Sequence, residues 1–390
     1  MVFDQMELGL MPASAQNRQH KETMRGDFAP IERLDVSAYR IPTATPESDG
    51  TLDWDATTLV VVDLVAGGTH GFGYSYADTA TGRLILDLLA DVVIGRDPMD
   101  VPAAWLAMVR AIRNLGRPGI VSMAISAVDT AMWDLKAKLL DVSLATLLGQ
   151  VREGVPIYGS GGFTSYSITE LQDQLAGWVD EGLGMIKMKV GRDPSADIDR
   201  VRAARGAIGP NLPLFVDANG AYERKQALEF AHAFADLGVG WFEEPVSSDD
   251  LEGLRLIRDA GPPGVAVTAG EYGYDLPYFR RMLEAGAVDV LQADATRCAG
   301  ISEFLRVGAL CWSHSMPLSS HCAPSLHVAL GCALPAICHL EYFFDHVRIE
   351  QLLFDGAPRP VDGCLRPDLS RPGLGLELKH ADAARWQVSI

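Results

Sequence analysis

The stretch "MIKMKV", residues 185–190, places two lysines inside an otherwise apolar segment. It follows a helix-like segment and precedes the turn "GRDP", so the pattern predicts a short buried strand. Alternate residues of a strand share a face, which puts Lys187 and Lys189 on the same side. An unpaired ammonium group in a dry interior costs several kcal/mol, and two neighbouring ones also repel each other. The lysine face therefore meets water, as on an exposed edge strand, or it meets anionic groups.

The same kind of short apolar strand recurs along the chain after residue 150 and alternates with amphipathic helices, which is typical of parallel βα units. The expected strands are "VPIYGSG", "MIKMKV", "PLFVDAN", "VGWFEEP", "VAVTAGE", "DVLQAD", "MPLSSH" and "HLEYF". Ionisable residues recur at or near the strand ends, 20 to 28 positions apart: Lys189, Asp217, Glu243, Glu271, Asp294, His321 and Glu341. In a (β/α) barrel these ends converge on one pocket. We therefore expect a barrel whose mouth is charged and faces both lysines.

The ionisable residues divide by their chemistry. Asp217, Glu243 and Glu271 end three consecutive strands, and three oxygen ligands with open positions suit Mg²⁺. Zinc is disfavoured because these strand ends carry neither His nor Cys. Asp294 and His321 end the next two strands, and an Asp beside an imidazole is the ordinary arrangement of a general acid or base. Such a pocket suits removal of a proton next to a carboxylate.

Composition and charge limit the partners. The 390 residues carry a formal net charge of −18, which argues against binding of nucleic acid or an anionic membrane. No apolar run reaches the roughly 18 residues that a membrane helix needs. The six cysteines form no C-x-x-C pair, and the N-terminus lacks a secretory pattern. We therefore expect reduced cysteines, a cytoplasmic location and a small-molecule partner.

The pattern also divides the chain into four parts. Residues 1–28 are polar and rich in turn formers, which predicts a loosely attached tail. Residues 29–150 alternate like a small antiparallel sheet and then become helical, which predicts an α+β domain. Residues 151–360 hold the barrel, and residues 361–390 form a C-terminal segment.

The motifs "KMK", "VDAN", "WFEEP", "AGE", "QAD", "SSH" and "HLEYF", in this order and spacing, resemble the mandelate racemase subgroup of the enolase superfamily over roughly residues 30–385. The resemblance implies a modified TIM barrel, (β/α)7β, under an N-terminal α+β capping domain that the C-terminal segment completes. It also implies Mg²⁺ on Asp217, Glu243 and Glu271, a homo-oligomer, and a small carboxylate substrate such as an acid sugar. Sites of this superfamily combine a Lys or His base with Mg²⁺.

The resemblance further implies a role for each remaining group of the site. Lys189 would be one acid or base, and His321, paired with Asp294, would be the other, on the opposite face of the substrate. Lys187 would touch the substrate carboxylate and lower the pKa of Lys189. Glu341 would hydrogen-bond the carboxylate. Two cap loops, "IPTATPESDGT" (41–51) and "GFGYSYAD" (71–78), would select the substrate.

Four further residues keep two interpretations each. Asn219 either hydrogen-bonds the substrate or caps the turn that follows. Arg297 is either a cation beside the Asp–His pair or a surface charge at the start of a helix. Glu244 is expected behind the metal ligands or in an ion pair. His339 shares a strand face with Glu341, which makes it a candidate substrate contact or a packed core residue.

The expected reaction begins with abstraction of the proton alpha to a carboxylate, through an ene-diolate intermediate. With a hydroxyl at C3, loss of water gives a 2-keto-3-deoxy acid, so the main prediction is a hydro-lyase, an acid-sugar dehydratase of carbohydrate catabolism. A racemase or epimerase, or a cycloisomerase, is the alternative, because the same two bases permit these outcomes. A non-catalytic relative would be signalled by a lost metal ligand or base, and none is lost.

Overall fold

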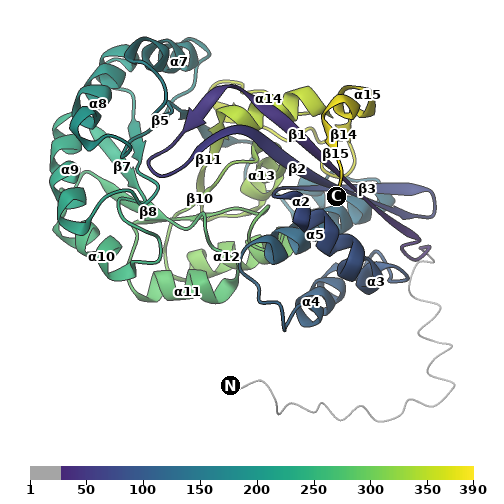
Figure 1. Ribbon diagram of the computed structural model, residues 1–390. Coiled ribbons are helices and arrows are strands. Elements are labelled where there is room, and N and C mark those ends of the chain that lie inside the picture. Colours follow the sequence, from purple (N-terminus) through teal and green to yellow (C-terminus); the bar gives the residue numbers. More distant parts are fainter. Residues whose placement is uncertain (1–27) are drawn as a thin grey trace.

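The computed structural model describes residues 28–390, so the predicted N-terminal tail lies, apart from residue 28, outside the described residues. The described chain forms a (β/α) barrel with an α+β cap beside it, and a long hairpin of the cap reaches over the barrel (Figure 1). Within residues 28–390 we find no helix of the length and apolarity that crossing a membrane requires.

Eight parallel strands close the barrel. They are β4 (Val155–Gly161), β5 (Ile186–Lys189), β6 (Leu214–Asp217), β7 (Val239–Glu243), β8 (Ala266–Ala269), β9 (Val290–Ala293), β10 (Leu318–Ser320) and β11 (Ile337–Phe343). β11 pairs with β4, where Glu341 lies opposite Tyr158, and this pairing removes both sheet edges. All eight strands lie at the predicted segments, and the predicted fold is confirmed.

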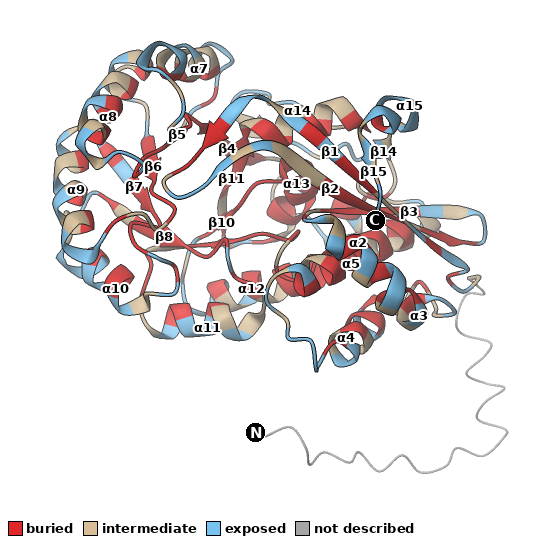
Figure 2. Ribbon diagram, in the orientation of Figure 1, coloured by how far each residue is buried: buried red, intermediate tan, exposed pale blue. Residues whose placement is uncertain are grey.

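Helices cover the outside of the barrel. They are α7 (Ile168–Asp180), α8 (Pro194–Ile208), α9 (Arg224–Asp236), α10 (Leu251–Ala260), α11 (Leu276–Glu284), α12 (Ile301–Ser313) and α13 (Pro324–Ala333), and α14 (Phe344–Leu353) follows the last strand. In α7, Ser167 and Glu170 form a capping box, and the side chains of Leu171, Leu175 and Trp178 are buried. The helices bury the side that faces the strands and expose the other (Figure 2).

The cap is a four-stranded sheet covered by helices. Its strands are β1 (Arg33–Ser48), β2 (Asp53–Ala66), β3 (Thr69–Tyr76) and β15 (Gln387–Val388), in the order β15-β1-β2-β3. Its helical segments are α2 (Thr79–Leu84), η1 (Ile85–Leu89), α3 (Ala90–Val93), α4 (Val101–Ala111), α5 (Ile120–Leu139) and α6 (Leu144–Leu148). α5 lies so close to β3 that a Cβ on Gly73 would come 2.2 Å from the carbonyl oxygen of Ala127.

The C-terminal segment returns to the cap, as the resemblance implies, and it also contacts the barrel. β13 (Cys364–Leu365) pairs with the beginning of β4, and β12 (Phe354–Asp355) pairs with β14 (Glu377–Leu378). After α15 (His380–Ala383) and η2 (Ala384–Trp386), β15 joins the cap sheet, where Val388 lies opposite Ala38. The boundary near residue 150 stays a proposal; α6 ends at Leu148 and β4 begins at Val155.

Two details of the cap differ from the sequence prediction. The segment 41–51 is not a loop, because β1 continues to Ser48 and pairs with β2, with one irregularity between Pro42 and Glu47. The segment 71–78 is not a loop either, because β3 extends to Tyr76 and pairs with β2. Pairing with β2 supplies backbone hydrogen bonds to residues elsewhere in the chain, and the composition of a short polar segment does not predict such bonds. Within the part of the cap predicted to be helical, α4 begins at Val101 and holds Pro102 in its first turn, where proline is tolerated.

Candidate active site

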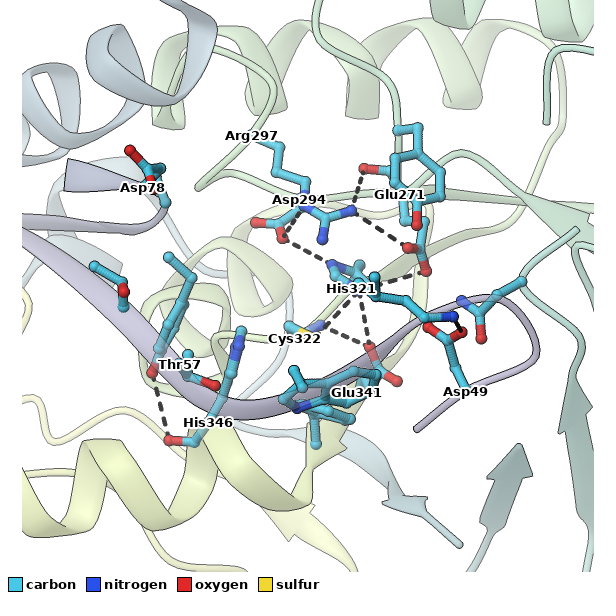
Figure 3. A pocket seen from close by; sticks show the side chains of 18 of the residues that line it. Asp49, Thr57, Asp78, Glu271, Asp294, Arg297, His321, Cys322, Glu341 and His346 are labelled. Atoms are coloured by element: carbon cyan, nitrogen blue, oxygen red, sulfur yellow. Dashed lines mark hydrogen bonds and ion pairs between the residues drawn. The ribbon is translucent and has the colours of Figure 1, made fainter. Parts of the chain in front are cut away.

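The structure brings the predicted site residues to one end of the barrel. Lys187 and Lys189 lie on β5; Asp217 and Glu243 end β6 and β7; Glu271, Asp294 and His321 follow β8, β9 and β10; and Glu341 lies within β11. Apart from Lys187, the second residue of β5, all lie in the C-terminal half of a parallel strand or just after its end, and these ends converge at the barrel mouth. Figure 3 shows His321 between Glu271, Asp294 and Glu341.

Three carboxylates form a compact group of oxygen atoms. Asp217, Glu243 and Glu271 are buried, and each offers an oxygen within 4.8 Å of the others. The indole of Trp241 orients Glu243 by donating a hydrogen bond to its Oε2 at 2.9 Å. Oε2 of Glu271 accepts no hydrogen bond from the described residues. A hard divalent cation such as Mg²⁺ prefers an all-oxygen donor set, so these side chains could hold it.

The strand face that carries Lys187 and Lys189 meets carboxylates and not water. Lys187 is fully buried, with Nζ 2.6 Å from Oε1 of Glu243 and 2.8 Å from Oε1 of Glu341. Lys189 donates to Oδ2 of Asp217 at 2.5 Å. An exposed edge strand is therefore excluded. The ammonium of Lys187 lies behind the carboxylates and does not line the cavity, so its contact with a substrate stays a prediction.

Charge and burial together set the protonation of this group. Burial raises the pKa of Glu243 to about 8, with the neighbouring Asp217 adding to the shift. Burial would also raise the pKa of Asp217, but Lys189 and Lys187 outweigh it and hold that pKa below its usual value. Burial and the neighbouring Lys187 would lower the pKa of Lys189, but the attraction to nearby carboxylates, chiefly Asp217, outweighs them and raises that pKa above its usual value. The bond to Asp217 thus favours the protonated form of Lys189.

His321 and Asp294 form a hydrogen-bonded pair on the other side of the carboxylates. Nδ1 of His321 lies 2.8 Å from Oδ2 of Asp294. Thr296 donates to the second oxygen of Asp294 from its backbone N–H at 2.6 Å and its hydroxyl at 2.7 Å. Although burial opposes it, the bond from His321 holds the pKa of Asp294 well below its usual range. Nε2 of His321 is left near the carboxylates, 3.4 Å from Oε2 of Glu271.

Glu341 is held by two residues that the sequence did not single out. Ser160, on β4, donates its hydroxyl to Oε1 at 2.6 Å. The backbone N–H of Cys322 donates to Oε2 at 2.8 Å, and its thiol lies 3.2 Å from Nε2 of His321. Ser160 lies in "VPIYGSG", where the sequence predicts a strand but assigns this serine no role. Both contacts arise from neighbouring strands, which no local pattern in the sequence indicates.

A cavity of about 460 Å³ opens above this group, between barrel and cap. From the barrel it is lined by residues that include Lys189, Asn219, Glu271, Asp294, Arg297, His321, Cys322 and Glu341. From the cap it is lined by residues that include Asp49, Leu52, Trp54, Thr57, Tyr76 and Asp78. Both cap segments expected to contact the substrate thus contribute to the cavity, through Asp49 and through Tyr76–Asp78.

Asn219 and Arg297 both belong to the cavity. Asn219 has φ 47°, and its N–H donates to Oδ1 of Asp217 at 2.9 Å, so its backbone forms the turn while its side chain lines the cavity. Arg297 places Nη1 3.3 Å from Oε1 of Glu271 and Nε 3.9 Å from Oδ2 of Asp294. Only 21% of the Arg297 side chain is exposed, so it is a cation beside the Asp–His pair and not a surface charge.

Glu244 lies directly behind the carboxylate group. It is buried, its backbone has φ 38°, and Oε1 finds no partner among residues 28–390. Burial and the nearby Glu271 raise its pKa well above the usual value. The structure thus favours the interpretation that Glu244 is a buried neighbour of the carboxylates over that of an ion-pair partner.

His339 does not line the cavity, which favours its interpretation as a packed core residue, and its contact with a substrate stays a prediction. Its ring packs against Tyr158, Phe215 and Trp241, with centroids 5.0 to 5.7 Å away, and Nδ1 lies 2.9 Å from the hydroxyl of Ser319. Burial lowers its pKa to about 4. Two residues along a strand span about 6.6 Å, so a side chain two positions before Glu341 lies one layer deeper in the barrel.

A capped (β/α) barrel with three carboxylates, a lysine and an Asp–His pair at its mouth defines an enzyme of the enolase superfamily. "Enolase C-terminal domain-like" matches residues 170–383, and "Mandelate racemase / muconate lactonizing enzyme, N-terminal domain" matches residues 38–149. The chain belongs to the mandelate racemase/muconate lactonizing enzyme family, which confirms the resemblance seen in the sequence.

Curated relatives match nearly the whole chain. L-talarate/galactarate dehydratase of Salmonella typhimurium is 33% identical over 91% of this chain and 90% of its own length. 3,6-Anhydro-alpha-L-galactonate cycloisomerase of Streptomyces coelicolor is 33% identical over 92% and 99%. These relatives are a dehydratase and a cycloisomerase, in agreement with the predicted lyase and its isomerase alternative.

Solved structures agree with the fold. A mandelate racemase/muconate lactonizing enzyme-like protein from Rubrobacter xylanophilus is 55% identical, with a TM-score of 0.90 over 92% of this chain and all of its own. A racemase from Streptomyces coelicolor with bound magnesium is 31% identical, with a TM-score of 0.87 over 92% and 100%. The predicted Mg²⁺ cofactor agrees with the magnesium in that structure.

Proposed function

We propose that the protein is a Mg²⁺-dependent hydro-lyase that removes water from an acid sugar and yields a 2-keto-3-deoxy acid. One observation carries this proposal. Lys189 and the His321–Asp294 pair line the same cavity and flank one group of buried carboxylates. Two proton-transfer groups around a cation site suit removal of the proton alpha to a carboxylate, followed by protonation of a leaving hydroxyl.

Asp217, Glu243 and Glu271 are the side chains that would hold Mg²⁺. Their donor atoms are all carboxylate oxygens within 4.8 Å of one another, and the buried Oε2 of Glu271 is free to accept a bond. Mg²⁺ binds oxygen ligands at about 2.0–2.1 Å and keeps open positions for water or substrate oxygens. When bound, the cation stabilises the negative charge that develops on the substrate carboxylate as the α-proton leaves.

Lys189 and His321 would move the protons. One of them takes the proton from C2, and the other donates a proton to the C3 hydroxyl as the C–O bond breaks and water leaves. The enol that results then becomes the 2-keto acid. To act as the base, Lys189 must give up its bond to Asp217 and its own proton. His321 is oriented for transfer at Nε2 because Asp294 occupies Nδ1.

The remaining polar side chains would position the substrate. Asn219 lines the cavity with a buried amide oxygen that has no partner among the described residues, so it can bond a substrate hydroxyl. Glu341 also lines the cavity, and Ser160, Cys322 and Lys187 fix its orientation.

The family resemblance implies that Glu341 hydrogen-bonds the substrate carboxylate. Burial would raise the pKa of Glu341, but Lys187 and His321 hold it well below its usual value, so one of the two carboxyl groups must gain a proton before such a bond forms.

The dehydratase and cycloisomerase among the relatives support two outcomes of the same first step. Cycloisomerisation is the second candidate, since the cycloisomerase matches with the same identity of 33%. Purified protein incubated with Mg²⁺ and a panel of aldonic and aldaric acids should form a 2-keto acid from at least one of them. Loss of substrate without a 2-keto product would favour the cycloisomerase or an epimerase. Absence of both with every acid would reject the proposed dehydration.

The cytoplasmic location and the homo-oligomer remain proposals from the sequence. All six cysteines are free thiols in the structure, which supports a reducing compartment.

A further inference from the structure

We infer that this site selects acid sugars with a single carboxylate, whose far end is neutral, over the matching diacids. This inference rests on the proposed function and names its substrate class. The substrate carboxylate is assigned to the barrel end of the cavity, beside Glu271 and Lys189. The opposite end of the substrate must then face the cap.

A carboxylate lines the cap side of the cavity. Asp78 is the N-cap of α2, where its side chain accepts from the N–H of Ala80. The second acidic residue that the cap contributes, Asp49, lies on the same side of His321 as Glu271 and does not belong to this end (Figure 3). In Figure 3, Asp78 and Thr57 lie on the opposite side of His321 from Glu271. Like charges repel, so a second carboxylate on the substrate would meet an unfavourable field at this end. A hydroxyl or methyl group would not.

The imidazole on the cap side of the cavity offers no compensating charge. His346, on α14, stacks on Tyr76 with ring centroids 3.4 Å apart, and its Nδ1 accepts from the N–H of Ala323 at 3.3 Å. Burial and the nearby His321 lower the pKa of His346 to about 3, so its ring is neutral at physiological pH. A neutral ring with Nδ1 as acceptor carries its hydrogen on Nε2. It can therefore donate a hydrogen bond to a substrate hydroxyl or carboxylate, but it supplies no positive charge to offset the carboxylate of Asp78.

The cations of the cavity are committed to the barrel end. Lys189 is bonded to Asp217, and Arg297 lies against Glu271 and Asp294. The guanidinium of Arg297 also lies over the ring of Tyr272, 5.1 Å from its centroid. Moving either cation toward the cap would leave buried carboxylates unpaired, which is costly. A diacid would therefore gain little from them at its far end.

The preference is measurable with acid pairs that share their configuration at C2–C5 and differ only at C6: gluconate with glucarate, and galactonate with galactarate. For each acid, kcat/KM for 2-keto acid formation and the Kd from calorimetry are measured with Mg²⁺ and wild-type protein. We expect the Kd of each monoacid that binds to be at least about tenfold lower than the Kd of its diacid, the equivalent of about 1.4 kcal/mol. A diacid that binds as tightly as its monoacid, or more tightly, overturns the inference even where dehydration occurs.

A variant tests the charge directly. Asp78→Asn removes one carboxylate from the cap side and keeps an N-cap residue of equal quality. We expect the diacid-to-monoacid ratio of affinities to rise about fivefold, as for loss of one repulsive charge pair. Asp193→Asn is the matched control, because Asp193 is the N-cap of α8, accepts from the residue two positions on, and does not line the cavity. An unchanged ratio in Asp78→Asn, or an equal rise in both variants, contradicts the inference.

The two proposals fail separately. If monoacids bind in preference to diacids but no acid loses its C2 proton or forms a 2-keto acid, the proposed dehydration is wrong and the inferred selectivity stands. If dehydration proceeds best with diacids, the selectivity is wrong and the proposed reaction stands.

Discussion

Replacing Gly50 by alanine should disturb the active site from the cap side. Gly50 lies at the tip of the β1–β2 hairpin, which is attached to the barrel where Ser48 and Thr164 share a hydrogen bond of 2.6 Å. A Cβ on Gly50 would come 2.3 Å from the carbonyl oxygen of Ala218 and 2.8 Å from that of Val190. Both are backbone atoms, which cannot rotate away as a flexible side chain can.

The size of the effect follows from these distances. Ordinary van der Waals contact begins at 3.4 Å, so the hairpin tip and the barrel must separate by about 1 Å. Val190 and Ala218 directly follow Lys189 and Asp217, so the shift reaches a proposed proton-transfer group and a proposed metal ligand. A misplacement of about 1 Å costs about 100-fold in rate, and overpacking costs about 1–3 kcal/mol of stability.

The assay compares kcat/KM and the melting temperature of Gly50→Ala with those of wild type. Gly184→Ala is the control, because Gly184 precedes β5 and a Cβ there meets no atom within 4 Å in the described chain. We expect a large loss of kcat/KM only in Gly50→Ala. Should that variant fail to fold, Thr164→Val removes the Ser48 bond more gently and should lower kcat/KM in the same direction. Wild-type kcat/KM in Gly50→Ala would refute the idea that the hairpin tip sets the site geometry, whether or not the melting temperature falls.

Three further predictions concern the site and the cap. Glu243→Gln should lower kcat by more than about 100-fold and weaken Mg²⁺ binding in calorimetry, while the circular dichroism spectrum stays unchanged. The loss should be this large because Glu243 is a proposed direct ligand, whose removal costs more than removal of a residue that only supports a ligand. Wild-type Mg²⁺ affinity in the variant would contradict the metal assignment. His321→Asn and Lys189→Ala should each lower kcat by about 10² to 10⁴-fold. Deuterium exchange at C2 should survive for one C2 epimer in the first variant and for the other epimer in the second, because the two side chains address opposite faces of the substrate. Identical exchange patterns in the two variants would contradict that arrangement. Burial raises the pKa of Glu47 to about 8, so between its usual value and pH 8 the unfolded chain has released a proton that the folded protein retains, and stability falls as the pH rises. The melting temperature of Glu47→Gln should therefore decline less between pH 5 and pH 8 than that of wild type, and an equal decline would show that Glu47 does not cause the loss.

The barrel and most of the candidate site were predictable because each βα unit repeats one physical pattern. A short apolar strand buried on both faces ends in an ionisable residue, and parallel strands bring these ends together. Asp217, Glu243 and His321 could be found in this way from their spacing alone. Alternation along a strand also placed His339 on the correct face, but it does not reveal depth, and His339 lies one layer below Glu341.

The cap and the contacts between strands were less predictable. Segment 41–51 contains two prolines and other turn formers, yet pairing with β2 keeps most of it extended. The contacts of Ser160 and Cys322 with Glu341 join residues 181 and 19 positions apart, and both depend on how neighbouring strands are placed in the barrel. The anchoring of Gly50 against Ala218 likewise depends on how the cap docks, which no local propensity encodes.

The most direct test of the central claim is a proton NMR spectrum of the wild-type protein with a turned-over acid sugar in D₂O, recorded with Mg²⁺ and again with excess EDTA. With Mg²⁺ the C2 proton signal should disappear as the signal of a C3 methylene carrying one deuterium grows, and neither change should occur in EDTA. A product that retains the original C2 proton, or an equal rate without a divalent cation, would contradict metal-assisted abstraction of the α-proton.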